Sequence, residues 1–134
     1  ILIMNILIPS IIGVVVVLVF IGWMMIRKGK ARRLSSSSAA KYAGAWQKAI
    51  AVQDVHRKIL EMEKVLESAM QELGYQGSFA DKMRTAGPRF SNKEQIWQAH
   101  KLRNRIAHEM GMEVKDWEGR MCEEAFGKAL RTLS

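Results

Sequence analysis

Residues Trp97–Glu109, WQAHKLRNRIAHE, combine a helical repeat with a concentration of polar side chains. His100, Asn104 and His108 are spaced four apart, so a helix stacks them along one face. Leu102 and Ile106 repeat this spacing on another face and would pack against neighbouring helices. Because a polar stripe is costly to bury unpaired, it must line a groove or an interface.

The relation between Arg103 and His108 restricts how both could serve one site. They are five residues apart, which at about 100° per residue places them roughly 140° apart around a helix axis. They converge only if the helix distorts near its end or if a second copy of the chain completes the site. Gly111 is a plausible stop for this helix.

The segment Arg103–His108, RNRIAH, resembles the R-N-x-x-x-H signature of the HEPN superfamily (higher eukaryotes and prokaryotes nucleotide-binding). These are small all-helical domains, and many of them are RNases. Ala45–Ile50 (AWQKAI), Glu72–Ser78 (ELGYQGS) and Ile96–Glu109 resemble a set of short bacterial HEPN-like proteins. The resemblance extends over roughly Tyr42–Leu133.

The resemblance implies a role for each residue of the motif. His108 would be the general acid or base, Arg103 would hold the scissile phosphate of RNA, and Asn104 would orient His108 or the phosphate. It implies no metal or other cofactor, and two protomers whose motifs line one cleft. The alternative is a buried hydrogen-bonded network of Arg103, Asn104 and His108 that only fixes helix packing.

Charge is unevenly distributed along the chain. The formal net charge is +8, from 21 basic and 13 acidic residues. Five basic residues lie within seven positions, Arg27, Lys28, Lys30, Arg32 and Arg33, so the chain from Leu34 onward carries 16 basic and 13 acidic residues, or +3. The overall charge is therefore poor support for nucleic-acid binding.

The segment Ile6–Ile26 is a run of 21 uncharged residues, about 31 Å long as a helix, which matches the hydrocarbon core of a bilayer. A cleaved signal peptide is the alternative, but the charges follow the apolar run instead of preceding it. We therefore expect a transmembrane helix over 1–26, a basic juxtamembrane segment with a serine-rich linker over 27–40, and a helical bundle over 41–134. The five basic residues predict an external N-terminus and a cytoplasmic bundle, and they could contact lipid headgroups.

A long amphipathic helix is predicted to end at Gly74. Its apolar stripe alternates spacings of three and four, through Val52, Val55, Ile59, Met62, Leu66, Ala69 and Leu73. The other faces would carry Glu61, Glu63, Lys64 and Glu67. A bundle helix and a coiled-coil seam both fit this stripe, and Tyr42–Ile50 either continues the helix or precedes a bend. Ser35–Ser38 is either flexible or helix-capping.

Three further elements complete the expected all-α fold. A short helix is predicted over Phe79–Thr85, and a capping box of Ser91 and Glu94 should open the helix that carries the motif. A last helix is predicted over Glu113–Thr132. Its apolar side would include Val114, Trp117, Met121, Ala125 and Leu130.

Seven basic residues and one acid lie between Lys82 and Arg105, whereas Glu109–Glu124 holds six acids and two bases. This polarity favours a phosphate-bearing partner near Arg103 and Arg105, and it equally fits charges that pair across the helices. The nucleic-acid-binding candidates are Lys101, Arg105 and His100.

The other two histidines and the cysteine also have structural interpretations. His100 is interpreted as a groove or core histidine, and His56 as an exposed one. The single cysteine, Cys122, excludes an internal disulfide and should pack within the last helix. No spacing in the sequence resembles a zinc site.

Two functions follow from these observations. One is a membrane-anchored, metal-independent ribonuclease that uses Arg103 and His108 on RNA. The other is a non-catalytic accessory or scaffold subunit of a larger membrane-associated complex. Its partners would be the lipid bilayer and either a second copy of the chain or a larger assembly.

Overall fold

The computed structural model describes residues 1–29 and 32–134, and for residues 26–29 it describes the backbone alone. Six α-helices and one 3-10 turn make up its regular structure, with no strand among these residues, so the all-α prediction is confirmed. The chain divides into two compact units, Ile1–Ala31 and Arg32–Ser134.

The first unit is the single helix α1 (Leu2–Gly29). Residues Leu2–Met25 have a mean hydropathy of 2.8, and their apolar side chains are exposed instead of packed in a protein core. By length and composition α1 could therefore cross a membrane.

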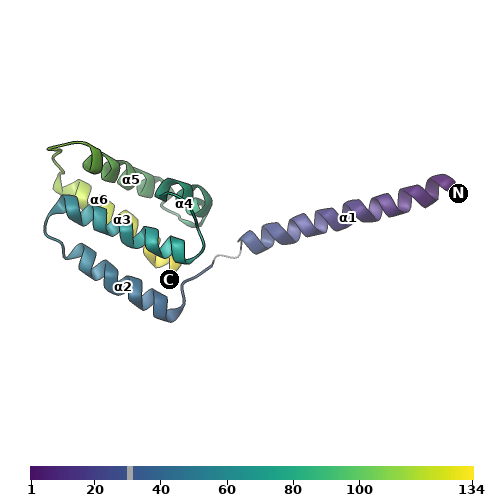
Figure 1. Ribbon diagram of the computed structural model, residues 1–134, viewed down its shortest axis with the longest axis horizontal. Coiled ribbons are helices and arrows are strands. Elements are labelled where there is room, and N and C mark those ends of the chain that lie inside the picture. Colours follow the sequence, from purple (N-terminus) through teal and green to yellow (C-terminus); the bar gives the residue numbers. More distant parts are fainter. Residues whose placement is uncertain (30–31) are drawn as a thin grey trace. The chain divides into compact units, whose positions relative to one another are not determined.

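The second unit is a helical bundle (Figure 1). Its elements are α2 (Ser36–Ile50), α3 (Val55–Glu72), α4 (Phe79–Ala86), the 3-10 turn Gly87–Arg89, α5 (Lys93–His108) and α6 (Asp116–Leu133). Helix α3 is the central element, because it contacts α2, α4, α5 and α6. Its buried side chains Ile59, Met62, Leu66 and Met70 share one core with Ile96 of α5 and Phe126 of α6.

The boundaries of α3 show why α2 is a separate helix. The Asp54 carboxylate accepts hydrogen bonds from the amides of His56 and Arg57, so it caps a new helix and Val52 lies before it. The predicted stripe therefore begins three residues too early. At the other end the prediction is confirmed: Gly74 has a φ of +96°, and the amide of Tyr75 reaches the carbonyl of Met70.

The segment before α2 belongs to the bundle. Leu34 is buried in the core, and its amide donates to the carbonyl of Leu133 at 2.8 Å. The Ser35 hydroxyl accepts from the Ser38 amide at 3.2 Å, and α2 begins at Ser36. The serine run is thus helix-capping and helical, and the folded unit already includes Arg32–Leu34.

The expected helix over 79–85 is confirmed as α4, whose capping box is formed by Ser78 and Asp81. The predicted capping box of Ser91 and Glu94 is wrong. Helix α5 begins at Lys93 without a side-chain cap. Asn92, not Ser91, occupies the N-cap position, and its buried side chain donates through Nδ2 to the carbonyl of Ala125 on α6 at 3.2 Å instead of capping α5.

Two details of the last two helices also differ from expectation. Helix α5 ends at His108 and the chain is already extended at Glu109, so Gly111, with a φ of +68°, lies in the following turn and does not terminate the helix. Helix α6 begins at Asp116, and Trp117 is 56% exposed instead of packed on its apolar side. Gly127 allows the indole of Trp46 to pack closely against α6, because a Cβ at this position would lie only 3.0 Å from the indole ring.

Candidate functional site

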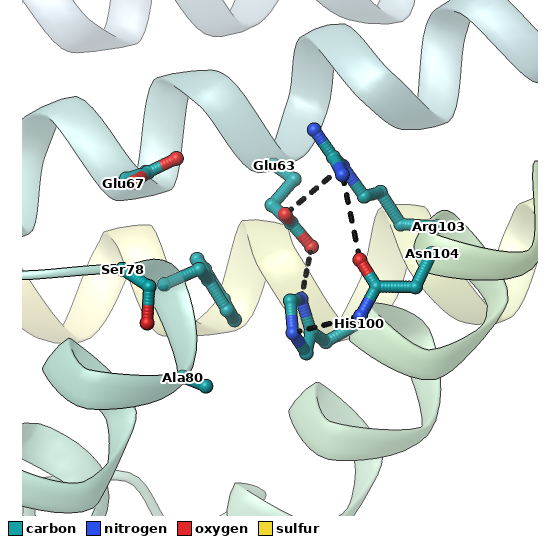
Figure 2. Close-up of a pocket in the computed structure, with 8 residues that line it drawn as sticks. Glu63, Glu67, Ser78, Ala80, His100, Arg103 and Asn104 are labelled. Carbon is teal, nitrogen blue, oxygen red and sulfur yellow. Dashed lines mark hydrogen bonds and ion pairs between the residues drawn. The ribbon is translucent and has the colours of Figure 1, made fainter. Parts of the chain in front are cut away.

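An open pocket of about 400 Å³ lies between α3, the start of α4 and α5. Figure 2 shows the side chains around it. They are Glu63, Glu67, Ser78, Phe79, Ala80, His100, Arg103 and Asn104. The pocket therefore collects part of the R-N-x-x-x-H motif together with two carboxylates from α3.

Glu63 is the buried anion of this pocket, with a side chain only 3% exposed. The expectation that it lies on a polar face of the helix is wrong. At about 100° per residue it projects about 40° from Ile59 and about 20° from Met70, inside the apolar stripe. A buried carboxylate requires compensating partners, and helix α5 supplies them.

Four side chains form a closed ring of polar contacts (Figure 2). His100 Nδ1 lies 2.9 Å from Glu63 Oε2, and His100 Nε2 lies 3.2 Å from Asn104 Nδ2. Arg103 Nη1 donates to Asn104 Oδ1 at 3.4 Å. Arg103 Nε lies 3.2 Å from Glu63 Oε1, close enough for an ion pair, although this buried nitrogen makes no hydrogen bond.

The ring defines the tautomer of His100. Arginine can only donate, so Asn104 presents its oxygen to Arg103 and its NH₂ group to His100. His100 Nε2 must then accept, which leaves the proton on Nδ1, where it is donated to the Glu63 carboxylate. The arrangement is a neutral imidazole whose Nε2 lone pair faces Asn104.

The imidazole is also held by aromatic packing. Its ring stacks on Phe79 with centroids 4.6 Å apart and meets Trp97 edge-on at 5.9 Å. The His100 side chain is 12% exposed. The two interpretations of His100, as a groove and as a core histidine, are therefore both partly right, since it lines the pocket and is mostly buried.

A second buried charge supports the wall of the pocket. The Lys82 side chain is 2% exposed, and its Nζ lies 2.6 Å from the Gly77 carbonyl and 3.3 Å from Glu67 Oε1. Lys82 thus ties the turn before α4 to α3. Arg103 in the pocket and Lys82 beside it are each paired with a carboxylate, so their charges are largely compensated.

The motif residues are divided by the structure. Arg103 and Asn104 line the pocket, whereas His108 is the last residue of α5, is exposed, and is not among the pocket-lining residues. Of the nucleic-acid-binding candidates, His100 lines the pocket, and Lys101 and Arg105 are exposed. Arg105 Nε lies 3.6 Å from Glu109.

Other basic residues between 82 and 105 are also engaged within the bundle. Arg84 pairs with Asp81 at 2.6 Å, and Arg89 donates to the hydroxyl of Tyr75 at 3.1 Å. Lys82, Arg103 and Arg105 are paired as well, so most of the basic residues between Lys82 and Arg105 have partners within the bundle.

Some of the clustered basic residues between 27 and 33 make contacts within the bundle. Arg32 Nη1 donates to the Leu73 carbonyl at 3.2 Å, so its guanidinium satisfies one of the carbonyls left unpaired at the C-terminal end of α3. Arg33 is exposed. The side chains of Arg27 and Lys28, and all of Lys30, lie outside the described residues.

Metal-ligating side chains are not grouped in the described part of the chain, where no three His, Cys, Asp or Glu residues could hold an ion. His56 is half-exposed and its Nε2 hydrogen-bonds to the carbonyl of Met112. Cys122 is fully buried in α6, and burial together with the carboxylates of Glu63 and Glu118 raises the pKa of its thiol to about 12. Its predicted packing role is confirmed.

No protein-family model matches this chain, and no curated protein or solved structure matches it either.

Proposed function

We propose that the chain is a membrane-tethered, metal-independent ribonuclease of the HEPN type. The observation that supports it is the placement of the Arg103 guanidinium and the Asn104 amide of the motif at one open pocket. Cleavage of RNA by its own 2′-hydroxyl needs a group that accepts a proton and a cation that stabilises charge on the phosphate, and it needs no metal.

The roles of Arg103, Asn104 and His108 follow the family resemblance. Arg103 would hold the scissile phosphate through its planar fork, and His108 would transfer protons. Because His108 lies at the exposed end of α5, it would serve a neighbouring copy of the pocket in a symmetric homodimer with α5 near the two-fold axis. The exposed Lys101 and Arg105 would contact the RNA backbone.

The first unit would anchor this activity to a bilayer. The span Leu2–Met25 of α1 would cross the membrane, and the basic residues that follow this span would remain on the cytoplasmic side. Since the folded bundle already includes Arg32, only a few residues separate it from α1, and its RNA substrate would be met at the membrane surface.

The test uses the full-length chain in detergent micelles with mixed RNA in EDTA. We expect products with 2′,3′-cyclic phosphate and 5′-hydroxyl ends, and no cleavage of DNA, which lacks the 2′-hydroxyl. Arg103→Ala should lower the rate, and Arg103→Lys should restore it only partly, because an ammonium lacks the planar fork. His108→Ala should lower it about 10²–10⁴-fold without changing the melting temperature.

A second function, a non-catalytic scaffold subunit, is favoured by the charge compensation in the pocket. Arg103 is paired with Glu63 and Lys82 with Glu67, which leaves little surplus charge to attract a phosphate. On this proposal RNA stays intact, and Arg103→Ala lowers the melting temperature instead of a catalytic rate.

A further inference from the structure

His100 differs from His108 in having the surroundings of a proton-transfer group. One ring nitrogen is held by the buried carboxylate of Glu63 at 2.9 Å, and the ring is fixed by stacking on Phe79. A carboxylate behind an imidazole fixes its tautomer and stabilises the imidazolium formed when the other nitrogen takes a proton. His108 lies exposed at a helix end.

We propose that His100, oriented by Glu63, is the general base of this pocket and that its substrate is a ribose 2′-hydroxyl next to a phosphodiester. This proposal rests on the proposed ribonuclease function and assigns the base to His100, which leaves His108 the role of general acid. His100 becomes a catalytic residue, Glu63 a positioning residue, and Arg103 the cation that meets the phosphate.

The geometry assigns His100 Nε2 as the reacting atom. Its present partner is Asn104, whose contacts at 3.2 and 3.4 Å are the longest hydrogen bonds in the ring. Asn104 is also only half-buried at the pocket surface, whereas Glu63 is 3% exposed. A substrate hydroxyl can therefore displace the Asn104 amide from Nε2 while the Glu63 contact on Nδ1 remains.

The step balances without a co-reactant. His100 Nε2 takes the proton of the 2′-hydroxyl while the 2′-oxygen forms a bond to phosphorus. The bond from phosphorus to the 5′-oxygen breaks, and that oxygen leaves with the electron pair and takes a proton from His108 of a neighbouring copy, which solvent then reprotonates. The products are a 2′,3′-cyclic phosphate and a 5′-hydroxyl, and His100 returns its proton to solvent.

The helix spacing explains why these groups meet. His100, Arg103 and Asn104 occupy positions i, i+3 and i+4 of α5 and so share one face. That face is opposed by α3 at Glu63. One chain thus supplies the base, its orienting carboxylate and the phosphate-binding cation, and a second copy is not required for the proton abstraction.

The experiment measures cleavage of a short RNA by the full-length chain in detergent micelles. His100→Ala should lower the rate about 10²–10⁴-fold, and added imidazole, which the pocket can admit, should restore part of it. Glu63→Gln should lower kcat more than it changes KM. His56→Gln and Glu61→Gln are matched controls outside the pocket and should keep the wild-type rate.

The outcomes separate the two proposals. If the wild-type chain leaves RNA intact, the ribonuclease function and the role of His100 both fail. If the wild-type chain cleaves RNA and a folded His100→Ala variant does so equally well, or is slow and not rescued by imidazole, only the role of His100 is refuted. His100→Gln replaces His100→Ala if the latter unfolds, and unfolding of both variants makes the histidine structural and refutes its catalytic role.

Discussion

Replacing Glu63 by glutamine tests whether the polar ring holds α5 against α3. Glutamine keeps the shape of the side chain, and its amide oxygen can still accept from His100 Nδ1. What it loses is the negative charge that both His100 and Arg103 approach. The change therefore isolates charge from volume at one buried position.

The loss of stability expected for Glu63→Gln depends on how exposed each partner of Glu63 is. Changing a charged hydrogen bond to a neutral one costs about 1 kcal/mol at His100, which is 12% exposed. The Arg103 side chain is 31% exposed, so solvent screening limits its ion pair to about 0.5–1 kcal/mol. A neutral amide is cheaper to bury than a carboxylate, which offsets part of both losses.

We therefore expect Glu63→Gln to lower the free energy of unfolding by about 1–2 kcal/mol. For a domain of this size that corresponds to a fall in Tm of about 5–10 °C. Glu63→Ala should cost about 3–4 kcal/mol, because it leaves a cavity and two unpaired donors. The control Glu61→Gln removes only an exposed pair with Lys64 and should cost less than about 0.5 kcal/mol.

The assay is urea unfolding of the full-length chain in micelles, followed by tryptophan fluorescence, because Trp97 packs edge-on against His100. A double-mutant cycle of Glu63→Gln with His100→Gln should show a coupling of at least about 0.5 kcal/mol. If Glu63→Gln is neutral or stabilising, or if the two changes are additive, the ring does not hold the helices together and the reasoning is refuted.

Three other expectations concern the rest of the chain. Cys122 should react with iodoacetamide at pH 8 far more slowly in the native chain than in urea, and equal reaction rates would contradict its burial. Because the pKa of its thiol is about 12 in the folded chain and 9.0 ordinarily, the stability of the fold should fall as pH rises from about 9 toward 12. Gly74→Ala should destabilise the bundle by about 1 kcal/mol in thermal unfolding, because Gly74 has a φ of +96°, and an unchanged Tm would show that the turn tolerates a side chain. A cysteine introduced at Ser36 should resist a membrane-impermeant maleimide in intact cells and react after permeabilisation, whereas labelling from outside would reverse the proposed orientation.

Local signals in the sequence were sufficient for much of the fold. The uncharged run Ile6–Ile26 determines a helix long enough to cross a bilayer, because length and hydropathy are additive properties of consecutive residues. Gly74 stops α3 and Phe79–Ala86 forms a helix for similarly local reasons, a left-handed φ and a capping box. The four-residue spacing of His100 and Asn104 likewise predicted that they share a face, and their side chains do meet.

The tertiary structure decided which polar groups are buried and what they contact. Glu63 lies within an apolar stripe, but only the approach of α5 makes its carboxylate the partner of His100 and Arg103. Asn92 stands at the start of α5, but its side chain donates to the carbonyl of Ala125 on α6 and makes no capping hydrogen bond to its own helix. His108 does not line the pocket that Arg103 lines, which agrees with their predicted angular separation, but only the packing of α3 against α5 shows which of the two faces the pocket. Sequence spacing determines a direction around one helix axis, whereas a site depends on which other helix faces that direction.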